Sequence, residues 1–265
     1  MATAVQTRVG DATVDLQPNG VALVEIHRPP NNHFDVYLIR ALSDIYESLD
    51  SNPGCRAIVL ASEGKHFCAG ANFSAPPTSS EAPLTTSGSD LYAEAVRLIE
   101  AKTPVIAAVN GAAIGGGLGL ACSADFRVGS AETRMSANFA QLGFHHGFGL
   151  TLTLPPIVGQ QRALEMLYTG KRLNGEEAYR IGLLDRFVAP EEVRAEALRF
   201  AAEIASSAPL AVASIRATMR AAIGDRYRAA TSREGTEQAI LRATEDFKEG
   251  VRATAERRPA QFKGR

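Results

Sequence analysis

The sequence predicts an α/β protein in which short buried strands alternate with helices. Residues 57–61 (AIVLA) and 105–109 (VIAAV) are continuous apolar runs, typical of strands buried on both faces of a parallel sheet. A helix is predicted between them, from Asp90 to about Ala101. Each run is followed by a turn rich in Gly and Ala. Strand, turn and helix in alternation are the pattern of an α/β fold.

Length and composition agree with one large unit or one domain with an appendage. The chain has 265 residues, of which 45% are hydrophobic and 22% charged, an ordinary balance for a folded domain. Its net charge of -1 argues against a dedicated nucleic-acid binder, which would show a basic excess. We therefore expect no nucleic-acid partner.

The cysteines and the N-terminal residues indicate the cellular compartment in which the protein is expected. Cys55, Cys68 and Cys122 are an odd number without metal-ligand spacing, so neither a disulfide framework nor a metal site is predicted. The first residues lack the layout of a signal peptide, and no apolar run is long enough to cross a bilayer. The simplest expectation is a cytoplasmic protein that does not enter a membrane.

The N-terminal elements follow in order. Residues 13–16 and 21–26 are β-rich and joined by Pro18-Asn19-Gly20, which predicts a hairpin because Asn and Gly tolerate positive φ. A helix is expected from Leu38 to about Asn52, then the strand 57–61. Residues 74–89 are rich in Pro, Ser and Thr and predict a surface loop, either a lid or a plain insertion.

The second half begins with the same unit and then changes character. After the strand 105–109, a helix is expected from about Gly116 and a third strand from Phe126. Beyond Gly159 the pattern is mostly helical. The expected division is an α/β core over residues 1–195 and a helical region over 196–265. The helical segments are predicted at 160–168, 175–181, 191–206, 209–223 and 231–253, with breaks that include Gly224.

Two turns stand where α/β proteins bind ligands, at the carboxyl ends of strands. The first is HFCAGANF, residues 66–73, and the second is NGAAIGGGLG, residues 110–119. Small residues let a ligand approach the backbone, and a helix that begins near Gly116 presents free N–H groups. The second turn matches neither a dinucleotide fingerprint nor a P-loop, and the chain has no G-x-S-x-G elbow.

Together these turns, their order and the Arg-Pro-Pro segment upstream of them resemble the crotonase (enoyl-CoA hydratase/isomerase) superfamily. Further matching segments are TPVIAAVNG at residues 103–111, GQQRAL at 159–164, TGKR at 169–172, AYRIGLLD at 178–185 and RRPAQF at 257–262. The resemblance covers nearly the whole chain.

The resemblance implies a spiral of ββα units with a helical C-terminal region that forms homotrimers or hexamers. It implies an acyl-CoA substrate, with CoA as part of that substrate and no further cofactor. The thioester oxygen would lie in an oxyanion hole formed by the backbone N–H groups of Ala71 and Gly116. The residues expected to contact the acyl-CoA are Arg28, Ala69, Gly70, Ala71, Asn72, Gly115, Gly116 and Phe139.

The sequence departs from the family at its acid–base positions. The two glutamates of hydratases fall on Gly119 and Phe139, and the later carboxylate of some isomerases and dehalogenases falls near Gly147. None of these residues can transfer a proton, and each such group contributes about 10²–10⁴ in rate. We therefore do not expect standard hydration. The first alternative is an acyl-CoA lyase, isomerase or hydrolase that acts through an enolate, with isomerisation, decarboxylation, thioester or C–C hydrolysis, and hydration by a substitute base all open. The others are a non-catalytic acyl-CoA binder and, least favoured by the neutral charge, an RNA-binding role.

His145 and His146 lie in the vacated region and are candidate catalytic acid–base groups. Either can instead be a hydrogen-bonded loop residue, and adjacent residues point in different directions, so at most one is expected to face the substrate. His66 is another catalytic candidate, although a loop residue beside the CoA entrance is the favoured interpretation. Cys68 is either a nucleophile or, as the absence of a paired base favours, a small buried residue. The basic tail, residues 248–265, is expected either to hold CoA phosphates or to be a solvated helix end.

Overall fold

The computed structural model describes residues 7–71 and 88–265. A central seven-stranded sheet has the spatial order β1-β2-β3-β4-β5-β7-β10, and a second, three-stranded sheet has the order β6-β8-β9. The strands of the central sheet are β1 (Thr7–Val9), β2 (Ala12–Leu16), β3 (Val21–Ile26), β4 (Ala57–Ser62), β5 (Val105–Ala108), β7 (Phe126–Ser130) and β10 (Arg186–Val188). Those of the small sheet are β6 (Ala112–Ile114), β8 (Arg134–Ser136) and β9 (Leu173–Asn174).

The central sheet is antiparallel at its β1-β2-β3 edge and parallel from β3 onward. β2 pairs with β3 as an antiparallel hairpin across the Asn19-Gly20 turn, as predicted, whereas β3, β4, β5, β7 and β10 are all parallel. All six residues of β4 are buried, which accounts for its continuous apolar sequence. The carboxyl ends of β4 and β5 lie side by side in this sheet, so the two glycine-containing turns that follow them are brought together.

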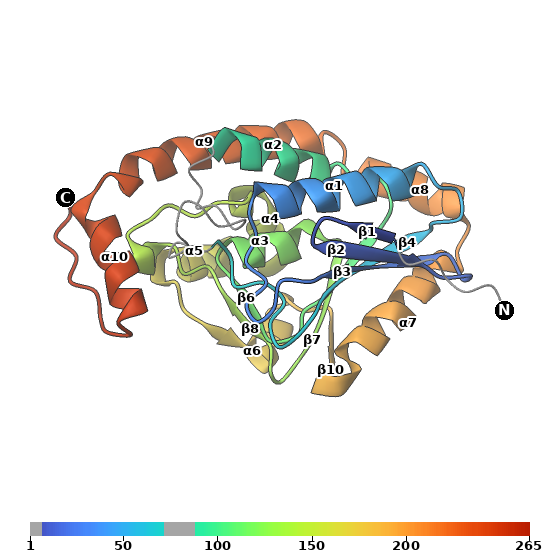
Figure 1. Ribbon diagram of the computed structural model, residues 1–265, viewed down its shortest axis with the longest axis horizontal. Coiled ribbons are helices and arrows are strands. Elements are labelled where there is room, and N and C mark those ends of the chain that lie inside the picture. Colours follow the sequence, from blue (N-terminus) through green and yellow to red (C-terminus); the bar gives the residue numbers. More distant parts are fainter. Residues whose placement is uncertain (1–6, 72–87) are drawn as a thin grey trace.

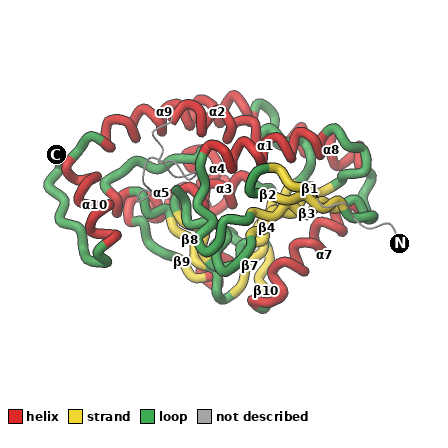
Figure 2. Tube along the Cα trace, in the orientation of Figure 1, coloured by secondary structure: helices red, strands yellow, loops and turns green. Residues whose placement is uncertain are grey.

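Helices cover the two faces of the central sheet (Figures 1 and 2). α1 (Val36–Asp50), α2 (Gly88–Ile99) and α9 (Ile223–Arg242) lie on one side, and α7 (Val193–Ala205) lies on the other. On the α7 side Val193, Ala197 and Ala201 are buried against residues of β4 and β5. The larger core lies on the α1 side and extends under α3 (Gly116–Ser123) and α4 (Leu150–Val158).

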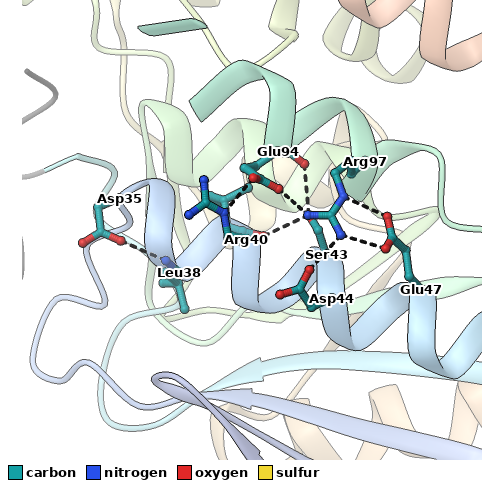
Figure 3. Close-up of polar contacts among 9 residues, drawn as sticks. Asp35, Leu38, Arg40, Ser43, Asp44, Glu47, Glu94 and Arg97 are labelled. Carbon is teal, nitrogen blue, oxygen red and sulfur yellow. Dashed lines mark hydrogen bonds and ion pairs between the residues drawn. The ribbon is translucent and has the colours of Figure 1, made fainter. Parts of the chain in front are cut away.

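A network of ion pairs fixes α2 on α1 (Figure 3). Arg97 of α2 donates hydrogen bonds to Glu47 and Asp44 of α1, at 2.7–2.8 Å. Arg40 of α1 bonds Glu94 of α2 at 2.7 Å. Several charges joined in one network hold geometry better than an isolated surface pair. The network therefore fixes the position of α2, which contributes a wall of the cavity described below.

The C-terminal region is helical, but two predicted details are wrong. The segment 231–253 is two helices, α9 and α10 (Glu245–Ala255), because the Thr244 side chain accepts a hydrogen bond from Phe247 N and caps a new helix. Gly224 does not break a helix. It lies in the first turn of α9, where a Cβ atom would collide with Glu100, so the glycine permits a close approach.

The remaining helices complete the fold around these elements. The predicted boundary between residues 195 and 196 falls inside α7, which packs on the sheet. The predicted loop 74–89 lies outside the described residues except at its end, where α2 begins. The helices not yet placed are α5 (Gln160–Thr169), α6 (Gly175–Arg180), α8 (Pro209–Met219) and the 3-10 turns Ala140–Leu142 and Pro190–Glu192.

Among the described residues no single helix is long and apolar enough to cross a membrane. One pair, Pro190–Ala205 with Pro209–Met219, meets that test jointly by length and composition, with a bend of 104° between its members.

Candidate functional site

A cavity of ≈ 280 Å³ lies between the two glycine-containing turns and the helices α2, α9 and α10. Ala69, Gly70, Ala71, Gly115, Gly116 and Phe139, all singled out from the sequence, line it. Asn72 lies outside the described residues. The other described lining residues are His33, Phe34, Leu91, Tyr92, Ile114, Asn138, Leu142, Phe144, Gly147, Phe148, Gln238, Arg242, Val251, Thr254 and Ala255. The wall is thus largely apolar with a few polar groups, as in most ligand sites.

The first turn is held so that one N–H group points into the cavity. The carbonyl oxygen of Gly70 accepts hydrogen bonds from Phe34 N and from His33 Nδ1, both at 3.1 Å. The Gly70 C=O and the Ala71 N–H belong to one trans peptide and point in opposite directions. The Ala71 N–H therefore points away from the segment that carries His33 and Phe34. Gly70 has φ +83, a conformation that glycine adopts readily.

The second turn presents its N–H through a helix terminus. Gly116 is the first residue of α3, and the Gly115 carbonyl accepts from Leu118 N at 3.1 Å and Gly119 N at 3.2 Å inside the helix. The Gly116 N–H therefore points outward from the helix start. Within the described residues, no backbone carbonyl accepts a hydrogen bond from Ala71 N or Gly116 N.

The two turns touch through glycine. A Cβ atom on Gly70 would lie 2.8 Å from Ile114 O and 3.6 Å from Gly116 N, and one on Gly117 would collide with Cys68 O. Cys68 also pairs with Ala113 in an isolated parallel bridge. Small residues at these positions are therefore required for the approach of the two backbones, which places both N–H groups at one cavity.

Arg28 lies behind the first turn, not on the cavity wall. Its guanidinium donates to Asp11 at 2.7 Å and to the His33 carbonyl at 3.3 Å, and it forms an ion pair with Asp35 at 3.1 Å. Its side chain is only 8% exposed, and it is absent from the described lining residues. Arg28 thus fixes the segment that carries His33 and Phe34, and these two residues hold the Gly70 carbonyl.

The space that acid–base carboxylates would need is filled. A Cβ atom on Gly119 would lie 2.7 Å from Phe148 Cβ and 2.9 Å from Phe148 O. A Cβ atom on Gly147 would collide with the Tyr92 hydroxyl and the Gln238 amide. Phe139, the third such position, lines the cavity. Substitution alone cannot restore a carboxylate at residue 119 or 147 without moving these neighbours.

His145 and His146 are not among the described residues that line the cavity. Their rings stack with centroids 4.1 Å apart, and His145 Nδ1 bonds the His146 carbonyl at 2.8 Å. His146 Nε2 bonds Thr151 Oγ1 at 2.8 Å and lies 3.9 Å from the buried carboxylate of Glu234. Burial and the adjacent His145 lower the pKa of His146 to about 4. Both histidines are therefore hydrogen-bonded residues of the loop before α4, which is the alternative to a catalytic role that the sequence left open.

Glu234 was not anticipated from the sequence, and it organises this loop. Its carboxylate accepts from Gly149 N at 2.8 Å, Thr151 N at 3.0 Å and Thr151 Oγ1 at 2.6 Å. Burial raises its pKa. Since Gly149 and Thr151 are at the start of α4, the carboxylate satisfies N–H groups that the helix leaves free.

His33, for which the sequence suggests a structural or CoA-contacting role, lines the cavity. Tyr92, Gln238 and Arg242 line it too, and sequence reasoning missed them. The Tyr92 hydroxyl donates to Gln238 Oε1 at 2.9 Å, and Gln238 Nε2 donates to the carbonyls of His145 and His146 at 3.1 and 3.3 Å. Burial raises the pKa of Tyr92. These residues come from helices remote in sequence, so no local motif marks them.

The remaining candidates have structural surroundings. Cys68 is fully buried and burial raises its pKa to about 12, which confirms the small buried residue expected there. His66 Nδ1 accepts from Ala112 N at 3.3 Å, and burial lowers its pKa. Among the described residues no group of three or more His, Cys, Asp or Glu side chains is placed to hold a metal ion.

The basic tail folds back on α10 and is paired with acidic groups. Arg258 bonds both Glu249 and Glu256, and Arg252 bonds Glu249. The carbonyl of Arg265 accepts from Glu245 N at 2.8 Å and Asp246 N at 3.1 Å at the start of the helix. Much of the positive charge of the tail is thus balanced within the tail and α10.

Comparison with known proteins identifies the class to which this fold and cavity belong. The enoyl-CoA hydratase/isomerase family model matches residues 17–265. The chain belongs to this family, and with it to the crotonase superfamily. The described architecture is the crotonase α/β fold: an enoyl-CoA hydratase/isomerase from Pseudoalteromonas atlantica superposes with a TM-score of 0.84 at 31% identity, over 96% of this chain and 100% of that one.

Individual relatives carry more specific names. The chain is 35% identical over 245 residues to crotonyl-CoA hydratase of Syntrophomonas wolfei, covering 91% of this chain and 94% of the relative. It is also 35% identical over 247 residues to carnitinyl-CoA dehydratase of Proteus mirabilis, again covering 91% and 94%. These similarities span nearly the full length of each protein.

Proposed function

We propose that this chain is an enzyme that binds an acyl-CoA thioester and stabilises its enolate. One observation carries the proposal: Ala71 and Gly116 line one largely apolar cavity, and their N–H groups donate to no described backbone carbonyl. Negative charge develops on the thioester oxygen when a proton leaves the α-carbon. Two fixed N–H donors stabilise that charge without reorganisation, and one such donor is worth about 10²–10³ in rate.

His33 is the proposed general base for this reaction. Its ring lines the cavity, and because Nδ1 donates to the Gly70 carbonyl, Nε2 is the acceptor in the neutral ring. Histidine changes charge near neutral pH and serves as a base there. The filled positions at Gly119 and Gly147 support a reaction other than the two-glutamate hydration expected of standard hydratases.

The proposal is tested by exchange of the α-protons of butyryl-CoA in D₂O, followed by mass spectrometry of the recovered thioester. Wild type is expected to introduce deuterium at the α-carbon. The His33→Gln variant keeps a side-chain donor but has no base, and it is expected to bind the thioester and exchange about 10²–10⁴-fold more slowly. Equal exchange by the two proteins would remove His33 from the mechanism.

A non-catalytic acyl-CoA binder is the second candidate, favoured by the way Phe148, Tyr92 and Gln238 occupy the carboxylate positions. Tight binding without deuterium incorporation, across acyl groups of different length, would support it against the enzyme.

The homotrimer or hexamer remains a proposal that concerns α8. Leu210, Ile215 and Met219 on this helix are 85%, 64% and 80% exposed, and a subunit contact would cover such exposed apolar side chains. Sedimentation equilibrium of wild type and a Leu210→Glu variant tests it. A monomeric wild type would exclude it.

A further inference from the structure

We propose that Asn32 is a positioning residue for the transfer of the α-proton: it fixes the segment that carries the proposed base, His33, against the first turn. The inference rests on the proposed function and adds to it a residue that acts through the base. Its starting point is a buried amide. Asn32 is 0% exposed, although it lies in the connection between β3 and α1. A buried amide of this kind is expected to have its hydrogen-bonding groups occupied.

The Asn32 side chain joins three separate pieces of backbone. Its Nδ2 donates to the carbonyl of Glu63, directly after β4, at 2.9 Å. The same nitrogen donates to the carbonyl of His66, the first residue of the first turn, at 2.6 Å. Its Oδ1 accepts from Arg28 N at 3.0 Å. One side chain therefore ties the connection that carries His33 to the end of β4 and to the start of the first turn.

The backbone at this position favours asparagine as well. Asn32 has φ +49, in the left-handed region, which asparagine adopts more readily than most residues. Its two neighbours contact the turn directly: the Asn31 carbonyl accepts from Ala69 N at 2.9 Å, and His33 Nδ1 donates to the Gly70 carbonyl at 3.1 Å. Three successive residues thus bind the first turn, and the Asn32 side chain is the one that also reaches the end of β4.

This attachment keeps the base in register with an oxyanion donor. The donor Ala71 N belongs to the first turn, whereas the base His33 Nε2 belongs to the connection before α1. A thioester whose oxygen is held at the turn presents its α-carbon to the base only if the two segments keep their relative position. A displacement of about 1 Å can slow a reaction by about 10²-fold. Affinity depends on the whole cavity wall, so loss of the Asn32 amide is expected to slow proton transfer far more than it weakens binding.

A role in stability alone is the main alternative, because a buried and fully bonded amide stabilises a fold wherever it lies. The two roles differ in their coupling to His33. A structural role would slow exchange by the same factor whether or not the base is present. A positioning role acts through the base, so the two substitutions would be strongly non-additive.

The test is a double-mutant cycle of Asn32→Gly and His33→Gln, measured as exchange of the α-protons of butyryl-CoA in D₂O. Glycine accepts the left-handed backbone and removes the amide. In the wild-type background Asn32→Gly is expected to slow exchange about 10- to 10²-fold. It should change the dissociation constant of butyryl-CoA, measured by isothermal titration calorimetry, by less than about threefold. In the His33→Gln background it should slow the residual exchange by less than about threefold.

Asn31→Ala is the matched control, because it changes an exposed side chain of the same connection and leaves the carbonyl that Ala69 N binds. It should behave as wild type. Urea denaturation shows whether each variant is folded under assay conditions. Asn32→Asp serves if Asn32→Gly is unfolded: it keeps an oxygen for Arg28 N and lacks the N–H groups that hold the two carbonyls. The same non-additivity with His33→Gln is expected of it.

Three results overturn this inference alone. They are exchange by Asn32→Gly at the wild-type rate, equal fold losses from Asn32→Gly in the wild-type and His33→Gln backgrounds, and a loss of affinity as large as the loss of exchange. Absence of exchange by wild type, or equal exchange by wild type and His33→Gln, would overturn the proposed function together with it. The two failures are therefore distinguishable.

Discussion

The two sides of the cavity differ in what they offer a substrate. On one side, the first turn and the start of α3 present backbone N–H groups at Ala71 and Gly116, held by hydrogen bonds to the Gly70 and Gly115 carbonyls. On the other side lie Gly119, Phe139 and Gly147, the positions at which the resemblance to the family predicts carboxylates. There Phe148 fills the space at Gly119, and Tyr92 and Gln238 fill the space at Gly147.

The two sides therefore differ in role: backbone N–H groups serve ligand recognition, whereas side chains would serve proton transfer. The N–H groups depend on backbone geometry, so they persist as long as small residues allow the two turns to approach. Proton transfer depends on individual side chains and can be lost or relocated by substitution, with neighbours filling the space. The family to which the chain belongs therefore defines its ligand better than its reaction.

The largest expected effect is a loss of stability when Arg28, which fixes the segment behind the first turn, is replaced. Arg28→Gln removes one partner of a buried ion pair and leaves Asp35, whose side chain is 7% exposed, uncompensated. We expect the free energy of unfolding to fall by about 3–5 kcal/mol, as measured by urea denaturation. Arg8→Gln is the matched control: Arg8 also pairs with Asp11, but its side chain is 63% exposed, so a loss below about 1 kcal/mol is expected. Equal losses would refute the role of Arg28 in fixing the segment that carries His33 and Phe34.

The second prediction removes one N–H donor. A Cβ atom on Gly116 would meet the Phe34 ring, so both variants carry Phe34→Leu to clear the space. In that background Gly116→Ala keeps the N–H and Gly116→Pro removes it, at a first helical position that tolerates proline. We expect α-proton exchange to be about 10²–10³-fold slower with Pro than with Ala. Similar rates would show that this N–H does not act on the substrate.

The third prediction addresses the filled side. Gly119→Glu restores a family glutamate but forces its Cβ against Phe148 Cβ and O, at 2.7 and 2.9 Å. We expect the unfolding free energy to fall by about 1–3 kcal/mol from overpacking, without a gain in hydration of crotonyl-CoA. Ala121→Ser, on the same helix but a small change, controls for general sensitivity of α3. A stable Gly119→Glu variant that hydrates crotonyl-CoA would contradict the account.

The smallest effect is a pH dependence from His146. Its pKa is lowered to about 4 from 6.5, so below pH 6.5 the unfolded chain binds a proton that the folded chain does not. Stability is therefore lost as pH falls from 6.5 towards 4. The His146→Gln variant should lose less, by about 2 kcal/mol between pH 6.5 and about 5, in urea titrations at several pH values. If the unfolding free energies of wild type and variant changed with pH in parallel, the role of His146 would be refuted.

Sequence patterns predicted the elements that depend on local signals. The hairpin, α1, β4, β5 and the start of α3 were all predicted, because apolar runs and glycine turns mark them. Short strands such as β1, β6 and β9 have only two or three residues, too few for a period to show. The break between α9 and α10 depends on one capping residue, Thr244, within a continuous helical pattern.

Most of the cavity residues that the sequence singled out lie in the two glycine-containing turns, and Phe139 is the exception. Ala71 and Gly116 lie in turns with recognisable sequences, and both line the cavity. Tyr92, Gln238 and Arg242 could not be predicted, because they meet only after α2 and α9 pack together. Arg28 was expected at the ligand, but a conspicuous cation in a motif does not reveal that Asp11 and Asp35 surround it.

The central claim is that the N–H groups of Ala71 and Gly116 polarise a thioester carbonyl. Infrared difference spectroscopy of butyryl-CoA with a ¹³C-labelled carbonyl tests it most directly, since it requires no turnover. The carbonyl stretch should move to lower frequency on binding to the Phe34→Leu/Gly116→Ala protein and move less on binding to Phe34→Leu/Gly116→Pro. A bound thioester whose carbonyl stretch is the same in both proteins and in water would contradict the account.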